Sequence, residues 1–312
     1  MLFFIYLTMK NKDNLNIIKS YLPFSLKKII DIIPDNLQEI RLRANRPAAL
    51  CTPRKVYYIK DDFSLTDALS GNLIKTTSKE ITEAFSAICN YSVYSKQNEI
   101  INGYLTLKGG NRAGICGTSI VQNSSIVNIR DITSINLRVV SEMIGCSDKL
   151  LNIIDEIDSG VLICGAPCSG KTTLLHDIAR KLSYSHNVAL IDSRGELAAV
   201  YAGVAQNDVG MCDILDCYSK CDGFEHAVRC LSSDIIVCDE IGTSEDISAI
   251  ENASKSGVAV IASAHCRSKS ELESKPRFKR LLKNSVFKNI VFLNGKKNIG
   301  QVSKVISSYE FN

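Results

Sequence analysis

The sequence lacks any apolar stretch long enough to cross a membrane, and it also lacks a Cys-x-x-Cys pair. Its apolar start, residues 1–8, is too short for a membrane span and is not preceded by the basic segment of a signal peptide. Since Met9 followed by Lys10 would be an ordinary start, we expect residues 1–8 to be a start-site artefact or a short hydrophobic contact. Any attachment to a membrane would then go through a partner protein.

Cysteine is abundant, but its spacing excludes the usual cysteine-based sites. The chain is too long for a small disulfide scaffold, and nothing in it suggests secretion. A zinc site needs four ligands in tight pairs, whereas Cys212, Cys217, Cys221, His226 and Cys230 are irregularly spaced. We therefore expect a reduced cytoplasmic protein whose twelve cysteines act as small buried apolar residues.

A strong charge of one sign is also missing. The formal net charge is +4, from 37 basic and 33 acidic side chains. Domains that bind nucleic acid usually carry a marked basic excess gathered on one face. We therefore do not expect a nucleic acid to be a partner of this chain.

A phosphate-binding loop is predicted where the apolar run Val161–Cys164 meets the pattern Gly-x-x-x-x-Gly-Lys-Thr. The run is typical of a buried strand, and a helix follows at once, with apolar residues at helical spacing up to Leu182. Glycines let backbone N–H groups turn inward toward phosphates, at a helix N-terminus that favours negative charge. The candidate ATP-binding residues of this loop are Gly165, Ala166, Pro167, Cys168, Ser169, Gly170, Lys171, Thr172 and Thr173.

A second motif completes the pattern of a nucleotide hydrolase. The apolar run Ile235–Cys238 ends in Asp239 and Glu240, which is the form of a Walker B motif. Lys171 can reach the β- and γ-phosphates, while Thr172 and Asp239 can hold Mg²⁺. Glu240 can orient or activate the attacking water. The two motifs together predict ATP as the ligand and Mg²⁺ as the metal.

Polar residues follow two further predicted strands. Val188–Asp192 ends in an acid, and Glu196 lies four residues beyond it. Both acids are candidates to position or deprotonate water, and the alternative for Asp192 is a carboxylate at a helix N-terminus. His265 follows the apolar run 258–262, where a side chain could sense the γ-phosphate, and a structural histidine is the alternative.

Arginines form two groups in the first half of the chain. The groups are Arg41, Arg43 and Arg46, and Arg130 with Arg138. Exposed arginines are usually solvated or held in salt bridges. The alternative is that some of them contact the nucleotide of a neighbouring domain or subunit.

The alternation of predicted elements divides the chain into an α+β domain, residues 1–145, and an α/β P-loop domain with a largely parallel sheet, residues 146–312. In the first half we expect helices at 14–21, 26–33 and 78–88, the last capped by Ser78, and strands at 37–43, 49–51, 56–59, 103–108, 113–117 and 129–140. In the second half we expect helices at 148–157 (capped by Ser147), 171–182, 224–231 and 246–255, and strands at 161–164, 188–192, 235–238, 258–262, 288–293 and 300–306.

The order of several motifs resembles the stage III sporulation protein AA family, from about residue 37 to the end of the chain. The motifs are Glu39–Pro47, Gly110–Gly117, Ser134–Arg138, the P-loop, Ile191–Glu196, Gln206–Gly210, Ile235–Gly242 and Ala262–His265. The family is similar to the ATPases of type II and type IV secretion systems. The resemblance implies a RecA-like fold and a homohexameric ATPase in the mother cell of an endospore-former. It further implies that the ring energises or assembles a membrane channel complex that faces the forespore.

Residue roles follow from the resemblance position by position. It implies catalytic roles for Lys171, Glu240, Glu196, Arg138 and Arg229, a nucleotide contact for His265, and metal binding by Thr172 and Asp239. The sequence departs from the family pattern where Ser193 replaces a Glu, Gly195 replaces a Ser and Ser233 replaces a Pro. Ser193 removes one candidate acid, so Glu196 and Glu240 become the better candidates for activating water.

The sequence therefore predicts a Mg²⁺-dependent ATPase of the secretion type. The altered acidic segment favours one alternative, a nucleotide-binding scaffold of the channel complex with little turnover. A small-molecule kinase would need an acceptor pocket and usually a basic lid, and neither is evident. A nucleic-acid motor is disfavoured by the small net charge.

Overall fold

The computed structural model describes residues 14–34, 36–140, 142–154, 159–295 and 298–311. The chain forms two compact units that divide between residues 141 and 142, compared with the predicted division after residue 145. The apolar start, residues 1–8, lies outside the described residues. No helix in the described ranges is both long enough and apolar enough to cross a membrane.

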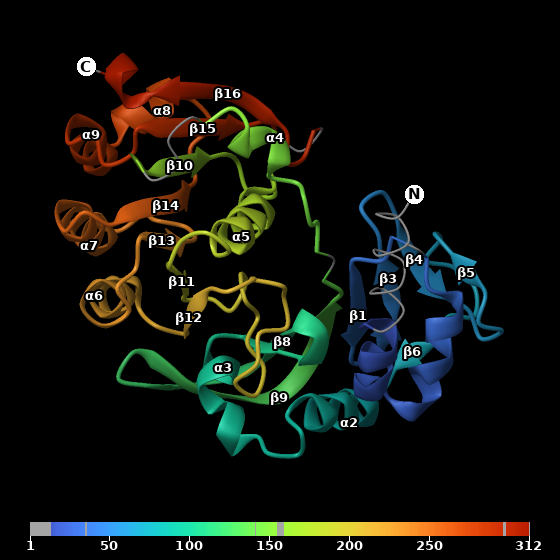
Figure 1. Cartoon of the computed structure of the whole chain (residues 1–312). Helices are drawn as coiled ribbons and strands as arrows, with labels where there is room; N and C mark the ends of the chain where they lie inside the picture. Colours follow the sequence, from blue (N-terminus) through green and yellow to red (C-terminus); the bar gives the residue numbers. More distant parts are fainter. Residues whose placement is uncertain (1–13, 35, 141, 155–158, 296–297, 312) are drawn as a thin grey trace. The chain divides into compact units, whose positions relative to one another are not determined.

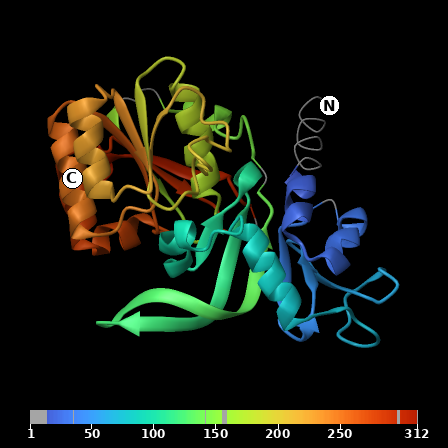
Figure 2. The same ribbon diagram turned by 90° about the horizontal axis from the view of Figure 1, so that it is seen from below.

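The first unit is built on an antiparallel sheet with the strand order β5-β4-β3-β1-β9-β8-β7 (Figure 1). Its strands are β1 (Glu39–Arg43), β3 (Ala49–Cys51), β4 (Val56–Ile59), β5 (Leu65–Thr66), β7 (Tyr104–Thr106), β8 (Arg112–Gln122) and β9 (Ser125–Arg138). A small separate pair joins β2 (Arg46–Pro47) to β6 (Lys75–Thr76). Figure 2 shows β8 and β9, in green, as a paired ribbon that extends past the rest of this sheet.

Helices cover this sheet because their apolar faces match the buried face of the strands. In β1 the buried Ile40 and Leu42 alternate with more exposed residues, as a half-buried strand requires. The helical elements are residues 14–21, η1 (Phe24–Ile32), α2 (Ser78–Ile88), η2 (Tyr94–Lys96), α3 (Gln97–Ile101) and η3 (Lys108–Gly110). The cap of α2 is Thr77 rather than the predicted Ser78, because Thr77 and Glu80 form a capping box.

The second unit is an α/β sheet with the order β12-β11-β13-β14-β10-β15-β16, parallel except for the last pair. Its strands are β10 (Val161–Cys164), β11 (Val188–Asp192), β12 (Asp213–Asp216), β13 (Ile235–Cys238), β14 (Ala259–Ala264), β15 (Asn289–Leu293) and β16 (Val302–Ser307). Its helices are α4 (Asp148–Leu151), α5 (Lys171–Leu182), α6 (Lys220–Cys230), α7 (Ser244–Lys255), α8 (Lys269–Ser274), α9 (Pro276–Lys283) and η5 (Ser308–Phe311).

Helices pack on both faces of this parallel sheet. Helices α6, α7 and α9 cover one face, and α5 covers the other (Figure 1). Every residue of β10, β11, β13 and β14 is therefore buried, which explains why these strands are continuous apolar runs in the sequence. The predicted α/β class and largely parallel sheet are confirmed for this half of the chain.

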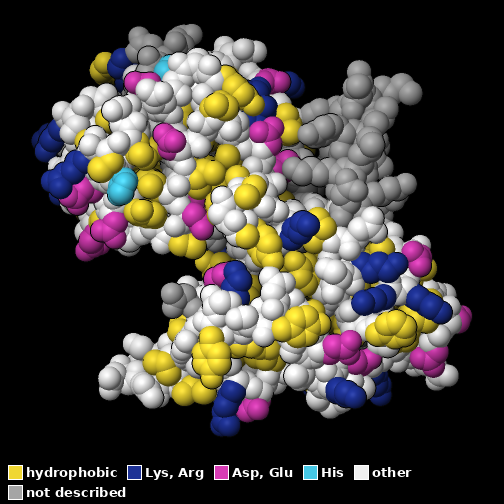
Figure 3. All heavy atoms as spheres, turned by 60° about the horizontal axis from the view of Figure 1, so that its bottom comes forward, with side chains coloured by type: hydrophobic (Ala, Val, Ile, Leu, Met, Phe, Trp, Pro, Cys, Tyr) yellow, Lys and Arg dark blue, Asp and Glu magenta, His cyan; other side chains and the backbone are white. Residues whose placement is uncertain are grey.

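Several details differ from the sequence-based expectations. Strand β12 was not predicted, because only a short edge strand occupies a polar, glycine-containing segment. Helix α4 ends at Leu151, within the predicted helix 148–157, whose last three residues lie outside the described ranges. The cysteines are not uniformly buried, since the exposed ones lie in loops or on solvent-facing positions: Cys116, Cys168, Cys217, Cys221 and Cys230. On the face drawn in Figure 3, basic and acidic side chains are interspersed, in keeping with the small net charge.

A buried carboxylate on α5 holds the segment that precedes β10. The Asp177 side chain is completely buried and accepts hydrogen bonds from the backbone of Gly145 (3.0 Å) and Ser147 (2.8 Å), from the Ser147 hydroxyl (2.6 Å) and from Arg180 (3.0 Å). Ser147 therefore binds Asp177 instead of capping α4 as predicted. Burial alone would raise the pKa of Asp177, but these hydrogen bonds outweigh it, and the pKa lies below its ordinary value of 3.8.

Replacing this carboxylate tests its contribution to stability. Asp177→Asn should lower the free energy of unfolding by about 3 kcal/mol at pH 7, because an amide cannot accept all of these hydrogen bonds. Since the folded-state pKa of Asp177 is depressed, its ionised carboxylate stabilises the fold above about pH 4. This stabilisation is lost as pH falls through the lower folded-state pKa. The stability difference between Asp177→Asn and wild type should therefore become smaller at acid pH. Asp148→Asn, at a carboxylate 61% exposed, should cost at most about 0.5 kcal/mol. Urea titrations at pH 7 and pH 3.5 measure the free energy of unfolding of both variants. Equal stability of Asp177→Asn and wild type at pH 7 would contradict the stabilising role of Asp177.

Candidate functional site

Polar residues gather at one edge of the second sheet because four parallel strands end there in register. In the sheet β11 lies beside β13, β13 beside β14, and β14 beside β10. Ile191 pairs with Cys238, Cys238 with Ala262, and Ala264 with Cys164, so the four strands reach the same edge together. The loops that follow them carry the predicted site residues. Ligands of open α/β sheets bind at this edge.

The P-loop follows β10 and curls around the side chain of Lys171. The Lys171 ammonium donates hydrogen bonds to the carbonyl groups of Gly165 (3.2 Å) and Ala166 (3.0 Å). Gly170 precedes α5 with a φ of +95°, and an added Cβ would lie 2.9 Å from the backbone nitrogen of Gly300. Only glycine fits this position without displacing the backbone of the neighbouring loop.

The loop also contains groups that a phosphate would satisfy. The Ser169 hydroxyl is buried and has no hydrogen-bond partner among the described residues. Burial lowers the pKa of Lys171, and the carboxylates of Asp239 and Glu240 oppose this shift. Cys168 takes up a left-handed φ of +60°, which is costly for a residue other than glycine and helps to curl the loop. A buried cation beside an unpaired hydroxyl suits the triphosphate of a nucleotide.

Oxygen ligands for a small hard cation lie directly beside the P-loop. The Thr172 hydroxyl donates to Asp239 Oδ2 at 2.7 Å, and the Ser263 hydroxyl donates to the other carboxylate oxygen. A hydroxyl, a carboxylate and phosphate oxygens form a typical Mg²⁺ environment. Clusters of three or more His, Cys, Asp or Glu suited to another metal do not occur among the described residues.

A row of hydrogen bonds crosses the edge of the sheet in the order of the strands. Lys171 Nζ lies 3.2 Å from His265 Nδ1, and His265 Nε2 lies 2.7 Å from Glu240 Oε1. Arg194 forms an ion pair with the other oxygen, Glu240 Oε2. Burial would raise the pKa of Glu240, but the hydrogen bond from His265 and the Arg194 charge lower it, so Glu240 is ionised at neutral pH.

Asp192 and Glu196, the two acids of the segment at the end of β11, differ in burial: Asp192 is buried and Glu196 is half-buried. Asp192 is 2% exposed and accepts four backbone N–H groups, from Glu196 (2.8 Å), Leu197 (3.0 Å), Ala198 (2.8 Å) and Ala199 (3.4 Å). Its carboxylate therefore shapes a turn, and the alternative of an acid at a helix N-terminus is wrong, because no helix follows β11 directly. Glu196 contributes its backbone N–H to that turn, and its side chain stays a candidate for positioning water.

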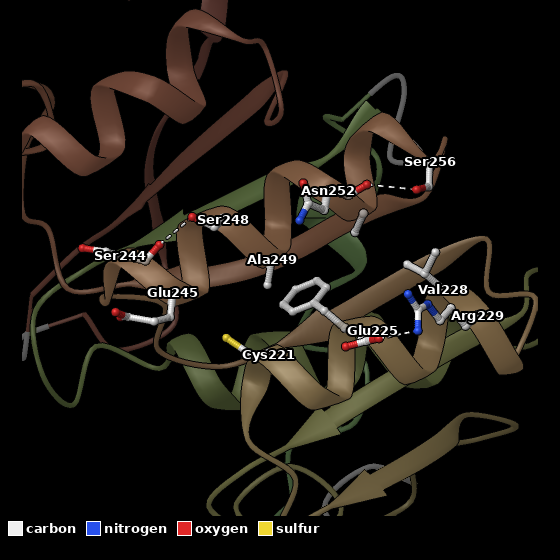
Figure 4. A pocket seen from close by; sticks show the side chains of 12 residues that line it. Cys221, Glu225, Val228, Arg229, Ser244, Glu245, Ser248, Ala249, Asn252 and Ser256 are labelled. Atoms are coloured by element: carbon white, nitrogen blue, oxygen red, sulfur yellow. Dashed lines mark hydrogen bonds and ion pairs between the residues drawn. The ribbon is translucent and has the colours of Figure 1, made fainter.

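The two arginines expected to reach a nucleotide belong to other elements, Arg229 to α6 and Arg138 to β9. Arg229 is in the last turn of α6, where it pairs with Glu225 at 2.5 Å. It borders a groove between α6 and α7 (Figure 4). Since α6 leads into the amino end of β13, Arg229 belongs to the sheet edge opposite the P-loop, so a contact with nucleotide would have to involve another subunit. Arg138 is exposed at the end of β9 in the first unit.

Two residues of the site were not predicted from the sequence. Arg194 and Ser263 enter it because β11 and β14 flank β13, and strand order cannot be read from local spacing. The sequence signal that could have indicated them is the apolar run that precedes each of these residues. Any polar residue just beyond a buried parallel strand is a candidate for the same edge.

Comparison with known proteins shows the family to which the chain belongs. A family model described as sporulation stage III, protein AA matches residues 9–310. The chain belongs to this family. Stage III sporulation protein AA of Bacillus subtilis (strain 168) is 33% identical over 303 residues, which cover 93% of this chain and 94% of the relative.

Solved structures with similar folds include a pilus retraction motor and an ATPase. The pilus retraction motor PilT, solved with bound ADP, has a TM-score of 0.58 at 16% identity, covering 87% of this chain and 78% of PilT. The ATPase DotB of Legionella pneumophila has a TM-score of 0.54 at 17% identity, covering 86% of this chain and 74% of DotB. These likenesses confirm the predicted RecA-like fold.

The close approach at Gly170 can be tested with a matched pair of glycine variants. Gly170→Ala should destabilise this family member by about 2–3 kcal/mol, because its left-handed backbone and the contact with Gly300 both resist a Cβ. Gly257 has a similar φ of +83° but nothing within 4 Å of an added Cβ, so Gly257→Ala should cost only about 1 kcal/mol. Urea unfolding and binding of a fluorescent ADP analogue distinguish them, since Gly170→Ala alone should weaken binding. Equal effects of the two variants would show that the P-loop contact is unimportant.

Proposed function

We propose that this chain is a Mg²⁺-dependent ATPase. The observation that carries the proposal is the arrangement at the carboxyl edge of the sheet. The P-loop lysine, the Thr172–Asp239 pair and Glu240 are linked there by hydrogen bonds of 2.7–3.2 Å through His265 and the loop. These are the parts that phosphoryl transfer to water requires.

Each residue has a task that its position supports. Lys171 and the N–H groups of the P-loop bind and orient the β- and γ-phosphates of ATP. Thr172 and Asp239 would hold Mg²⁺, and the chemistry that the ion supplies when bound is neutralisation of phosphate charge. Glu240, with Glu196 as a further candidate, orients the attacking water, and His265 contacts the γ-phosphate side of the site.

The family and fold support the wider role. Membership in the sporulation stage III, protein AA family supports action during sporulation, in the mother cell, on a membrane channel complex that faces the forespore. The fold shared with secretion ATPases supports assembly into a homohexamer. In such a ring Arg138 and Arg229 would reach the nucleotide of a neighbouring subunit and neutralise charge on the transferred phosphoryl group.

One observation favours a second candidate function, a nucleotide-binding scaffold of the same complex with little turnover. Ser193 stands where the family has an acid, and the neighbouring Asp192 is occupied by backbone N–H groups. The segment therefore offers only Glu196 as an additional acid. A scaffold would bind ATP and assemble without needing a strong base.

Substitution of the P-loop lysine tests the hydrolase assignment. Lys171→Ala should lower ATP turnover by about 100-fold or more and weaken nucleotide binding, because it removes the charge that faces the phosphates. Glu240→Gln should keep binding but lose turnover by about 100-fold, since the amide cannot activate water. Lys255→Ala removes an exposed lysine in the last turn of α7 and should be neutral. The measurements are phosphate release and ADP binding. Normal ATP turnover by Lys171→Ala would contradict the proposed ATPase function.

Size measurement with and without ATP separates the two candidate functions. We expect a hexamer that turns over ATP, because charge on the γ-phosphate would recruit arginines of the adjacent subunit. Light scattering and phosphate release on the same sample give both quantities. Hexamers that bind ATP without turnover would favour the scaffold, and a monomer that hydrolyses ATP would remove the need for arginines from a neighbour.

A further inference from the structure

The side chain of Arg194 ends the row that begins at Lys171. Each of its four residues comes after a different strand: β10, β14, β13 and β11. The spatial order of the row is therefore Lys171, His265, Glu240, Arg194. Lysine ammonium can only donate, so His265 Nδ1 must accept from Lys171 and Nε2 must carry the ring proton. His265 therefore donates to one oxygen of Glu240 while Arg194 holds the other.

We propose that Arg194 is a positioning residue, which fixes the carboxylate of Glu240 in the orientation that aligns the attacking water. This inference rests on the proposed ATPase function. A carboxylate rotates freely about its last bond unless both oxygens are held, and here His265 holds Oε1 while Arg194 holds Oε2. Arginine suits the task because its planar group is always charged and matches the carboxylate plane. Arg194 acts through Glu240 and does not itself contact ATP.

The backbone of Glu240 gives independent support. Its φ of +48° lies in the left-handed region, which a residue other than glycine rarely adopts. Two hydrogen bonds hold it there, from the Glu240 N–H to Asp239 Oδ1 (2.8 Å) and to Ser263 Oγ (3.0 Å). Strained conformations that the surroundings enforce are typical of functional sites. Backbone and side chain of Glu240 are thus both held in one orientation.

The loop that carries Arg194 is held equally firmly. Asp192 binds four N–H groups of residues 196–199, so the turn that contains Arg194 has little freedom. Asp192 ends β11 and the Walker B residues follow β13, its paired neighbour, which brings Arg194 within reach of Glu240. The Arg194 side chain is 53% exposed, and ion pairs at that exposure contribute little to stability. Its loss should therefore affect turnover far more than folding.

A double-mutant cycle tests the proposal. Arg194→Ala should lower kcat about 10-fold with KM changed less than about 2-fold, because the carboxylate loses its orientation while the phosphate contacts remain. Arg194→Lys should recover part of the loss. In a Glu240→Gln background, followed by single-turnover phosphate release, Arg194→Ala should cause no further loss. Thermal unfolding of Arg194→Ala should stay close to wild type.

The matched control is Arg280→Ala. Arg280 is also 53% exposed and ion-paired, to Glu251 at 2.6 Å, but it lies on α9 away from the row, so kcat should be unchanged. Wild-type kcat in Arg194→Ala, an additive loss in the Glu240→Gln background, or a raised KM at constant kcat would each overturn the positioning role while leaving the ATPase assignment intact. A wild-type protein that binds ATP but never hydrolyses it would overturn the ATPase assignment and this role with it.

Discussion

The hydrogen-bond register of four parallel strands is the constraint on which the site depends. Because β11, β13, β14 and β10 run in the same direction and end within about two residues of one another, the residues that follow them reach the same edge of the sheet. A shift of one residue in any pair would turn the following side chain to the other face of the sheet. Helices on both faces bury the strands completely and so hold that register.

Some buried carboxylates of the second unit bond mainly to the backbone, whereas residues at the candidate site bond to one another. Asp177 and Asp192 are almost fully enclosed, and backbone N–H groups take up their oxygens, so they stabilise the segments around the site. Lys171 instead donates to carbonyl groups of the P-loop, while Thr172 and Glu240 bond to side chains from neighbouring strands. This division explains how a site with several charges stays ordered. The carboxylates of Asp177 and Asp192 bond to the backbone, and those of Asp239 and Glu240 bond to side chains at the edge of the sheet.

Ser193, where the sequence departs from the family pattern, lies beside the candidate site. In its place the family pattern has an acid, yet the Ser193 hydroxyl is buried without a hydrogen-bond partner among the described residues. An acid there would have to share space with Asp192, while Glu240 already lies within reach of His265 and Arg194. Under the proposed function, Glu240 is therefore the main candidate for aligning water.

The sequence alone determined the local parts of this protein. The P-loop, the Walker B pair, the buried strands and the family were readable because each is encoded by neighbouring residues and by apolar runs that parallel sheets require. The edge strand β12, the role of Asp192 and the contacts of Arg194 and Ser263 were not readable, because they arise between residues far apart in the chain. The order of the strands in the sheet decides which side chains come into contact. The sequence gives only the order of the residues along the chain. Only the tertiary structure could therefore decide that Arg194, and not a second acid, accompanies Glu240.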